Sequence, residues 1–174
     1  PPTAFGYDPH LRSSYAQKWN FSVETDLSHG VIVEAGYFAT KGNKLLGARD
    51  INQPAPSPQV PNLRPVVSYS DINLTESSFS SIYHSLQGKL ECHFQTGFTG
   101  LFSYTWSKSI DNASSYFVSA TDANYPQDSN NVAGERGRSN FDVRQLFSGS
   151  FVYELPFGAG KSIGGNLRKW QSVA

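Results

Sequence analysis

Four histidines and one cysteine are the first candidates in this chain for transition-metal binding or nucleophilic chemistry. The histidines stand at positions 10, 29, 84 and 93, without the spacing of metal ligands. On one β-strand, His84 and His93 would point to opposite faces because an odd number of positions separates them. A metal site needs ligands that converge on one point, so we expect none. Cys92 is expected to behave as a small hydrophobic side chain, since no base is predicted to face it.

Two polar stretches could bind other ligands. Residues 158–162 end in Gly-Lys-Ser, as a phosphate-binding loop does, but that pattern requires a glycine where Leu155 stands, and we expect a turn. Calcium could use the side-chain oxygens of Asp122, Asn124, Asp128, Asn130 and Asn131. These residues lack the spacing of a calcium-binding loop, and Asn and Asp commonly form turns, so we expect a polar surface loop. No catalytic pair or triad emerges, and we predict that the chain is not an enzyme and needs no cofactor.

The alternation of apolar and polar residues predicts the elements that carry these side chains. Over 15–27, Trp19 and Phe21 fall on one face while Lys18 and Asn20 fall on the other. Such alternation is typical of β-strands with one apolar face. The predicted strands are about 14–28, 31–41, 81–94, 98–109 and 140–155, and a sixth begins near Trp170.

Two of the predicted hairpins close through three-residue turns that end in glycine. These turns are 28–30 and 95–97. A three-residue hairpin loop commonly ends in a left-handed residue, a conformation that glycine adopts at low cost. The residues that face each other across the turns are then Leu27 with Val31, and Phe94 with Phe98. This pairing brings the apolar rows of neighbouring strands onto one face.

The connections are short at one end of the predicted strands and long at the other. Long loops are expected over about 42–80 and 110–139, because both regions are rich in Pro, Asn, Ser, Asp and Gly. Short turns at one rim and long loops at the other are the layout of an outer-membrane barrel, whose long loops face outside. We therefore predict an all-β fold, an antiparallel up-and-down meander that forms part of the wall of a large transmembrane β-barrel. Residues 1–174 would be a single partial barrel segment of a longer protein.

The predicted wall has one face toward lipid and one toward water. The expected lipid-facing residues are Trp19, Phe21, Val23, Val31, Val33, Tyr37, Leu86, Leu90, Phe94, Phe98, Phe102, Tyr104, Trp106, Phe147 and Phe151. The opposite parity carries Lys89, Glu91, Asp142, Arg144 and Glu154, which would line the barrel lumen or form a solvated sheet face. A formal net charge of zero gives no basic field for nucleic acid. The expected partners are outer-membrane lipid and the remainder of the barrel.

Several short phrases of the sequence are similar to one family of outer-membrane proteins. They lie at 15–23, 33–37, 40–42, 49–53, 104–112, 135–137, 140–144 and 155–158. Together they resemble the TonB-dependent outer-membrane receptors of the Oar-like subgroup, from about residue 10 to the end. The resemblance implies a barrel of about 22 strands blocked by a plug domain, in the outer membrane of a Gram-negative-type bacterium. It also implies uptake or binding of an unidentified solute, with energy delivered to the plug by a TonB-type complex.

On this interpretation the two long loops face the exterior and are the candidates for ligand capture, because loops on a rigid scaffold commonly carry recognition. The resemblance assigns no individual ligand-binding residue. Two other interpretations stay open. A passive porin or adhesin barrel would have the same strands. A soluble extracellular β-sandwich binding module would bury the apolar rows as its core.

Overall fold

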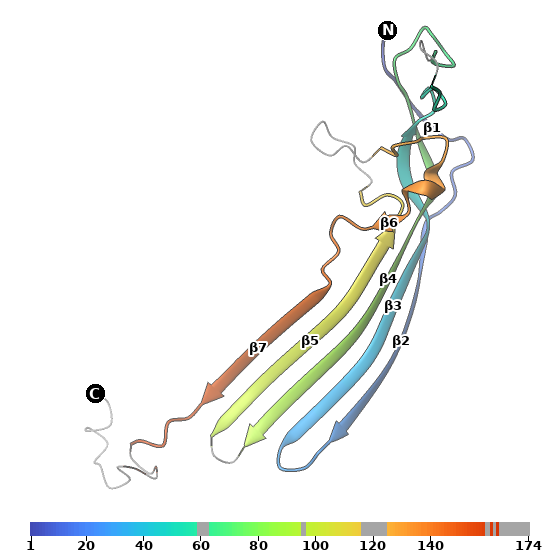
Figure 1. The fold of residues 1–174 in the computed structure, drawn as a ribbon. Helices are drawn as coiled ribbons and strands as arrows, with labels where there is room; N and C mark the ends of the chain where they lie inside the picture. The colour runs from blue at the N-terminus through green and yellow to red at the C-terminus, as the bar shows by residue number, and fades with distance from the viewer. Residues whose placement is uncertain (59–62, 95–96, 116–124, 159–160, 162, 164–174) are drawn as a thin grey trace. The chain divides into compact units, whose positions relative to one another are not determined.

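The fold is built from β-strands (Figure 1). A computed structural model describes residues 1–58, 63–94, 97–115, 125–158, 161 and 163. The strands are β1 (Ala4–Tyr7), β2 (Tyr15–Asp26), β3 (Val31–Asp50), β4 (Ile72–Phe94), β5 (Phe98–Asp111), β6 (Gly137–Arg138) and β7 (Gln145–Tyr153). One 3-10 turn, η1 (Val132–Glu135), is the helical element of these ranges. Among the residues described, no helix is both long and apolar enough to cross a membrane.

All seven strands belong to one sheet. Its order is β2-β3-β4-β5-β6, while β7 also pairs with β5 (Figure 1). From β2 to β6, strands that follow each other in sequence are neighbours in the sheet, which confirms the predicted all-β antiparallel meander. The sheet is open, because in the described ranges no further strand pairs with β2 or β7 at its edges.

The first strand was not predicted, and its pairing is parallel. β1 lies beside the beginning of β4, from Ala4 opposite Ile72 to Tyr7 opposite Thr75. A four-residue segment is too short for period-two alternation to identify it. A hydrogen bond from the Asp8 N–H to the Thr75 carbonyl, at 2.9 Å, continues this ladder beyond the strand. β1 therefore attaches the N-terminal segment to β4.

The prediction of a long loop over 42–80 is wrong in extent, because β3 continues to residue 50 and β4 begins at residue 72. The glycines of this region suggested turns. In the structure Gly47 lies inside β3, and a Cβ added there would lie 2.4 Å from the ring of Phe79. Phe79 is only 1% exposed. Glycine within a strand can mark such a close approach rather than a turn.

The predicted strand 140–155 is also too long, because β7 begins only at Gln145. Before it, the Asp142 N–H donates to the carbonyl of Ser139 at 3.1 Å, which makes a turn. The Asp142 carboxylate accepts from the backbone N–H of Ser109 at 2.7 Å, so a side chain replaces a strand partner. The alternation of β7 therefore cannot be extended back to Arg144. The sixth strand predicted near Trp170 lies outside the described residues.

The two hairpin turns lie in one of two compact units of the chain, formed by Ser22–Ala35, Gly88–Tyr104 and Phe147–Ala174. The residues beside the turns pair as predicted. The Leu27 N–H donates to the Val31 carbonyl at 2.9 Å, and the rings of Phe94 and Phe98 stack with centroids 6.1 Å apart. The apolar rows of these hairpins therefore meet on one face.

The last residue of each hairpin turn must be glycine for two reasons. Gly30 and Gly97 have φ values of +78° and +86°, in the region that favours glycine. Each also touches the backbone or Cβ of a neighbouring segment. A Cβ on Gly30 would lie 2.0 Å from the His93 carbonyl oxygen, and one on Gly97 would lie 2.9 Å from the Glu154 Cβ. Both turn carbonyls accept hydrogen bonds across these contacts, from the N–H groups of His93 and Glu154 at 2.6 and 2.8 Å.

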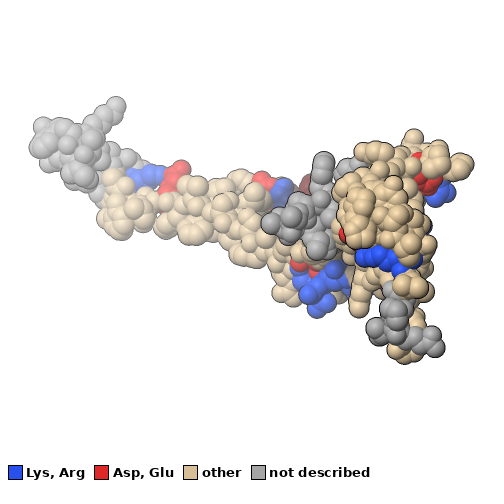
Figure 2. Space-filling model, turned by 90° about the horizontal axis from the view of Figure 1, so that it is seen from above, with Lys and Arg blue, Asp and Glu red and all other residues tan. Residues whose placement is uncertain are grey.

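The other unit, formed by Pro1–Phe21, Gly36–Gln87 and Thr105–Leu146, contains the loop-side ends of the long strands. Across both units, hydrophobic residues are mainly exposed. Only Ala39, Phe79 and Cys92 are buried among the described hydrophobic residues, whereas ten polar or charged residues are buried. Figure 2 shows large areas of one face without Lys, Arg, Asp or Glu. This arrangement is the reverse of a water-soluble protein, in which large exposed apolar patches are uncommon.

Candidate functional site

A cluster of charged and amide side chains lies where β3 ends and β4 begins. The Asp50 carboxylate accepts hydrogen bonds from the backbone N–H groups of Asn52 and Ile72, each at 2.9 Å. Its second oxygen lies 2.8 Å from Nη1 of Arg64, whose Nη2 lies 2.8 Å from the Asp71 carboxylate. One guanidinium therefore joins carboxylates at both ends of the loop between these strands.

Asn52 closes the same loop from inside. Its side chain is completely buried. The amide Nδ2 donates to the carbonyls of Val66, Tyr69 and Ser70 at 3.0, 3.1 and 3.2 Å, and Oδ1 accepts from the Val66 N–H at 2.7 Å. A buried amide that bonds this many backbone groups replaces the strand ladder that the loop lacks.

These contacts shift the pKa values of the groups involved. Burial alone would raise the pKa of Asp50, but hydrogen bonds from Ile72, Arg64 and Asn52 outweigh it and hold that pKa below its ordinary value of 3.8. The hydrogen bond to Asp50 raises the pKa of Arg64. Burial, together with the charges of Asp71 and Asp50, raises the pKa of Tyr125. The Asp50 carboxylate is therefore charged at neutral pH.

The second long loop is attached to the first through the neighbours of Asp50. Nη1 of Arg49 donates to the Ser129 carbonyl at 3.0 Å, and its Nε lies 3.0 Å from the Glu76 carboxylate as an ion pair. Gln53 donates to the Gln127 carbonyl at 2.8 Å and accepts from the Ser129 N–H at 2.5 Å. The residues of this cluster, hereafter the loop hub, are Arg49, Asp50, Asn52, Gln53, Arg64, Asp71, Glu76 and Ser129.

A small polar hollow of about 120 Å³ lies in the second loop. The residues that line it include Asp111, Ser114, Tyr125, Glu135 and Arg138. Ser114 donates to both oxygens of the Asp111 carboxylate at 3.0 Å. Charges of both signs and hydroxyl groups suit the recognition of a polar solute group.

The structure places the metal-ligand candidates apart. No group of three His, Cys, Asp or Glu residues could hold a metal ion in the described ranges. Of the possible calcium ligands, Asp128 accepts from the Asn130 N–H at 2.9 Å and Asn131 accepts from the Gly134 N–H at 3.2 Å. These are turn contacts, as expected for a polar loop. Asp122 and Asn124 lie outside the described residues.

The remaining candidates have ordinary structural contacts. His84 accepts or donates a hydrogen bond with the Tyr37 hydroxyl at 2.6 Å, and His93 lies 3.9 Å from the Glu91 carboxylate. Cys92 is buried, and no disulfide involves it. In the stretch 158–162, the Lys161 N–H donates to the Gly158 carbonyl at 3.1 Å, which is a turn contact.

The sequence phrase at 49–53 contained half of the loop hub, but its role was not predicted. The available signal was an Asp and an Asn two positions apart, Asp50 and Asn52, since Asp and Asn commonly bond to backbone N–H groups near turns. The partners of these residues, at 64–71 and 127–129, are distant in sequence. Alternation within strands gives no information about such contacts.

The comparison with known families agrees with the exposed apolar surface. A family model described as an outer membrane beta barrel domain matches residues 1–173, nearly the whole chain. No curated protein and no solved structure matches the chain. The match locates the sheet in the outer membrane, where its apolar face contacts lipid.

Proposed function

We propose that this chain, which belongs to the outer membrane beta barrel domain family, forms part of the wall of a receptor or transporter barrel. Its long loops capture an unidentified solute on the outer side of the membrane. In this proposal the complete barrel is blocked by a plug domain, and a TonB-type complex supplies energy for uptake by acting on that plug. The chain carries out no catalysis.

The observation that carries this proposal is the loop hub. A loop that recognises a solute binds more tightly if it is ordered beforehand, because ordering during binding costs free energy. Asn52 and Arg64 hold the first loop closed, and Arg49 and Gln53 attach the second loop to it. Loops held together in this way are ordered before a solute arrives, which supports a role in solute capture.

Electrical conductance separates a plugged receptor from a passive porin. The full-length protein would be purified in detergent and inserted into planar lipid bilayers bathed in potassium chloride. A receptor with a plug is expected to give no steady ionic conductance. A stable open channel would contradict the proposal and support the porin interpretation.

The soluble β-sandwich interpretation has a specific difficulty. A sandwich buries apolar residues between two packed sheets, whereas the described strands form one sheet. Phe21 is 71% exposed, and Phe147 and Phe151 are also exposed. These rings have no protein layer to cover them in the described part of the chain, and the hydrocarbon of a bilayer supplies the missing contact.

A further inference from the structure

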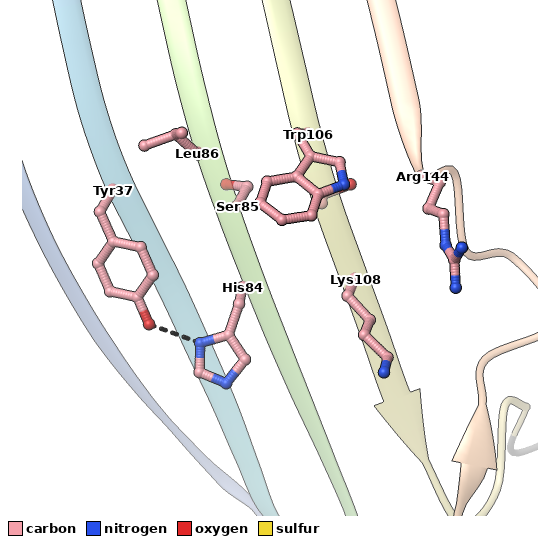
Figure 3. Close-up of a pocket in the computed structure, with 8 residues that line it drawn as sticks. Tyr37, His84, Ser85, Leu86, Trp106, Lys108 and Arg144 are labelled. Atoms are coloured by element: carbon pink, nitrogen blue, oxygen red, sulfur yellow. Dashed lines mark hydrogen bonds between the residues drawn. The ribbon is translucent and has the colours of Figure 1, made fainter.

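A hollow of about 380 Å³ lies on the face of the sheet that carries the aromatic residues. It lies in the unit that contains the long loops, across β3, β4 and β5 (Figure 3). Its lining side chains include Tyr37, His84, Leu86, Trp106, Lys108 and Arg144. Leu86 and Trp106 are exposed at 53% and 57%, and both belong to the predicted lipid-facing row.

The aromatic part of this hollow has the composition of a membrane boundary. The Tyr37 hydroxyl and His84 Nδ1 lie 2.6 Å apart, and their rings stack with centroids 6.0 Å apart. The Trp19 ring lies edge-on to the His84 ring, with the two centroids 6.4 Å apart. Rings with a polar group at one end are enriched where hydrocarbon meets lipid headgroups. The hollow is therefore expected at headgroup depth, near the long loops.

The charged part of the hollow is entirely basic. Lys108 and Arg144 extend in the same direction from neighbouring segments (Figure 3). Within the described chain neither side chain makes an ion pair, and no carboxylate lines the hollow. In contrast, Arg49 and Arg64 of the loop hub are each paired with carboxylates. The two cations of the hollow are thus available to an anion from outside the chain.

The position of Arg144 differs from the prediction. Alternation over 140–155 placed it on the polar face, but it lines the same hollow as Trp106 and Lys108. The turn before β7 causes this difference, because the chain from Ser139 to Arg144 does not follow strand geometry. The Arg144 carbonyl still accepts from the Ser107 N–H at 2.9 Å, which fixes the backbone at this point.

We propose that this hollow binds the phosphate-bearing headgroup of a lipid in the outer leaflet. Arg144 and Lys108 contact the phosphate, since guanidinium groups bind phosphate through two hydrogen bonds and ammonium groups act as point charges. Trp106 and Leu86 contact the beginning of the acyl chains. The lipid is favoured over free phosphate because the basic side chains lie beside exposed apolar residues that face the bilayer. The inference depends on the outer-membrane location and is independent of the proposed solute uptake.

Tryptophan quenching tests this binding directly. The full-length protein is placed in nanodiscs of phosphatidylcholine that contain a minority of phosphatidylglycerol. In one preparation the phosphatidylglycerol carries bromine on its acyl chains, and in the other an equal mole fraction of the phosphatidylcholine does. The contribution of Trp106 is obtained by subtracting the signal of a Trp106→Phe variant. Each Lys or Arg near an anionic membrane surface strengthens their association by a factor of about five. Brominated phosphatidylglycerol should therefore quench Trp106 several times more strongly than brominated phosphatidylcholine.

Three variants and one competitor decide the result. The double variant Lys108→Gln with Arg144→Gln should lose the preference for phosphatidylglycerol. The control Lys18→Gln with Arg136→Gln removes the same charge from exposed positions outside the hollow and should retain that preference. Lys108→Arg with Arg144→Lys keeps both charges and should also retain it. Equal quenching by the two lipids in the natural protein, or a preference unchanged in the Gln variant, would overturn the proposal. Loss of the preference on adding inorganic phosphate would assign the hollow to free phosphate instead, and would also overturn it.

Discussion

Asn52 shows how one side chain can hold a loop in shape. It is fully buried, and it bonds three carbonyls and one N–H group of the loop that it begins. A buried polar group that loses its partner costs about 1–3 kcal/mol. The free energy of the loop conformation therefore depends on this amide more than on any exposed charge around it.

Replacing Asn52 with alanine is expected to destabilise the loop by about 3 kcal/mol, because it leaves carbonyls and an N–H group without partners. Hydrogen exchange of the Val66 amide measures this local stability. Asn130→Ala is the matched control, since this side chain is exposed and exposed substitutions commonly change stability by less than about 0.5 kcal/mol. Equal exchange in both variants would show that the Asn52 contacts do not hold the loop.

Asp50 makes the loop conformation sensitive to acid. Its pKa is lower in the folded protein than the ordinary 3.8, so its stabilising contribution is complete above pH 3.8. It is lost as the pH falls through the folded value. A nitroxide on the exposed loop residue Val67 should become more mobile as the pH falls below the pKa of Asp50 in the folded protein. In Asp50→Asn the nitroxide should be more mobile at neutral pH already. A pH dependence that persists in Asp50→Asn would assign the effect to another carboxylate.

At the scale of elements, alternation predicted the parts of β2, β3, β4, β5 and β7 that have one apolar face, but neither β1 nor β6. It located the hairpins around 28–30 and 95–97 and the pairing of the residues beside them, because a one-residue shift would send the apolar row to the other face. It failed where the strands leave that pattern. Glycines occur within the strand along 42–50, and buried polar residues occur within the strand along 72–80. The sequence of these segments is therefore similar to that of a loop.

The contact between Gly47 and Phe79 is the clearest case of such a hidden strand. Gly47→Ala should destabilise the protein by about 1–3 kcal/mol, because the added Cβ would lie 2.4 Å from the Phe79 ring and overpack the site. Chemical denaturation of the detergent-folded protein measures the change. Gly88→Ala is the control, since no heavy atom lies within 4 Å of its added Cβ. A similar loss in both variants would mean that backbone conformation, rather than the ring, requires glycine.

At the scale of the whole molecule, the sequence predicted the class of fold and its location but not the contacts between loops. Net charge, alternation and loop lengths were sufficient for an outer-membrane barrel wall, which the family match supports. The loop hub and the basic hollow depend on residues far apart in sequence, such as Arg49 with Ser129 and Arg144 with Trp106. Period-two patterns describe one strand at a time, and therefore they contain no information on these sites.

The central claim is that the apolar face of the sheet touches hydrocarbon while its other face is wet. Nitroxides at Phe21 and Leu90, in a Cys92→Ser background and a lipid bilayer, test it against labels at Asn20 and Lys89 on the opposite parity. Collisions with oxygen should exceed those with a water-soluble nickel chelate at Phe21 and Leu90. The order should reverse at Asn20 and Lys89. If Phe21 and Leu90 are instead shielded from oxygen, or reached more readily by the nickel chelate, the assignment of the lipid face is wrong.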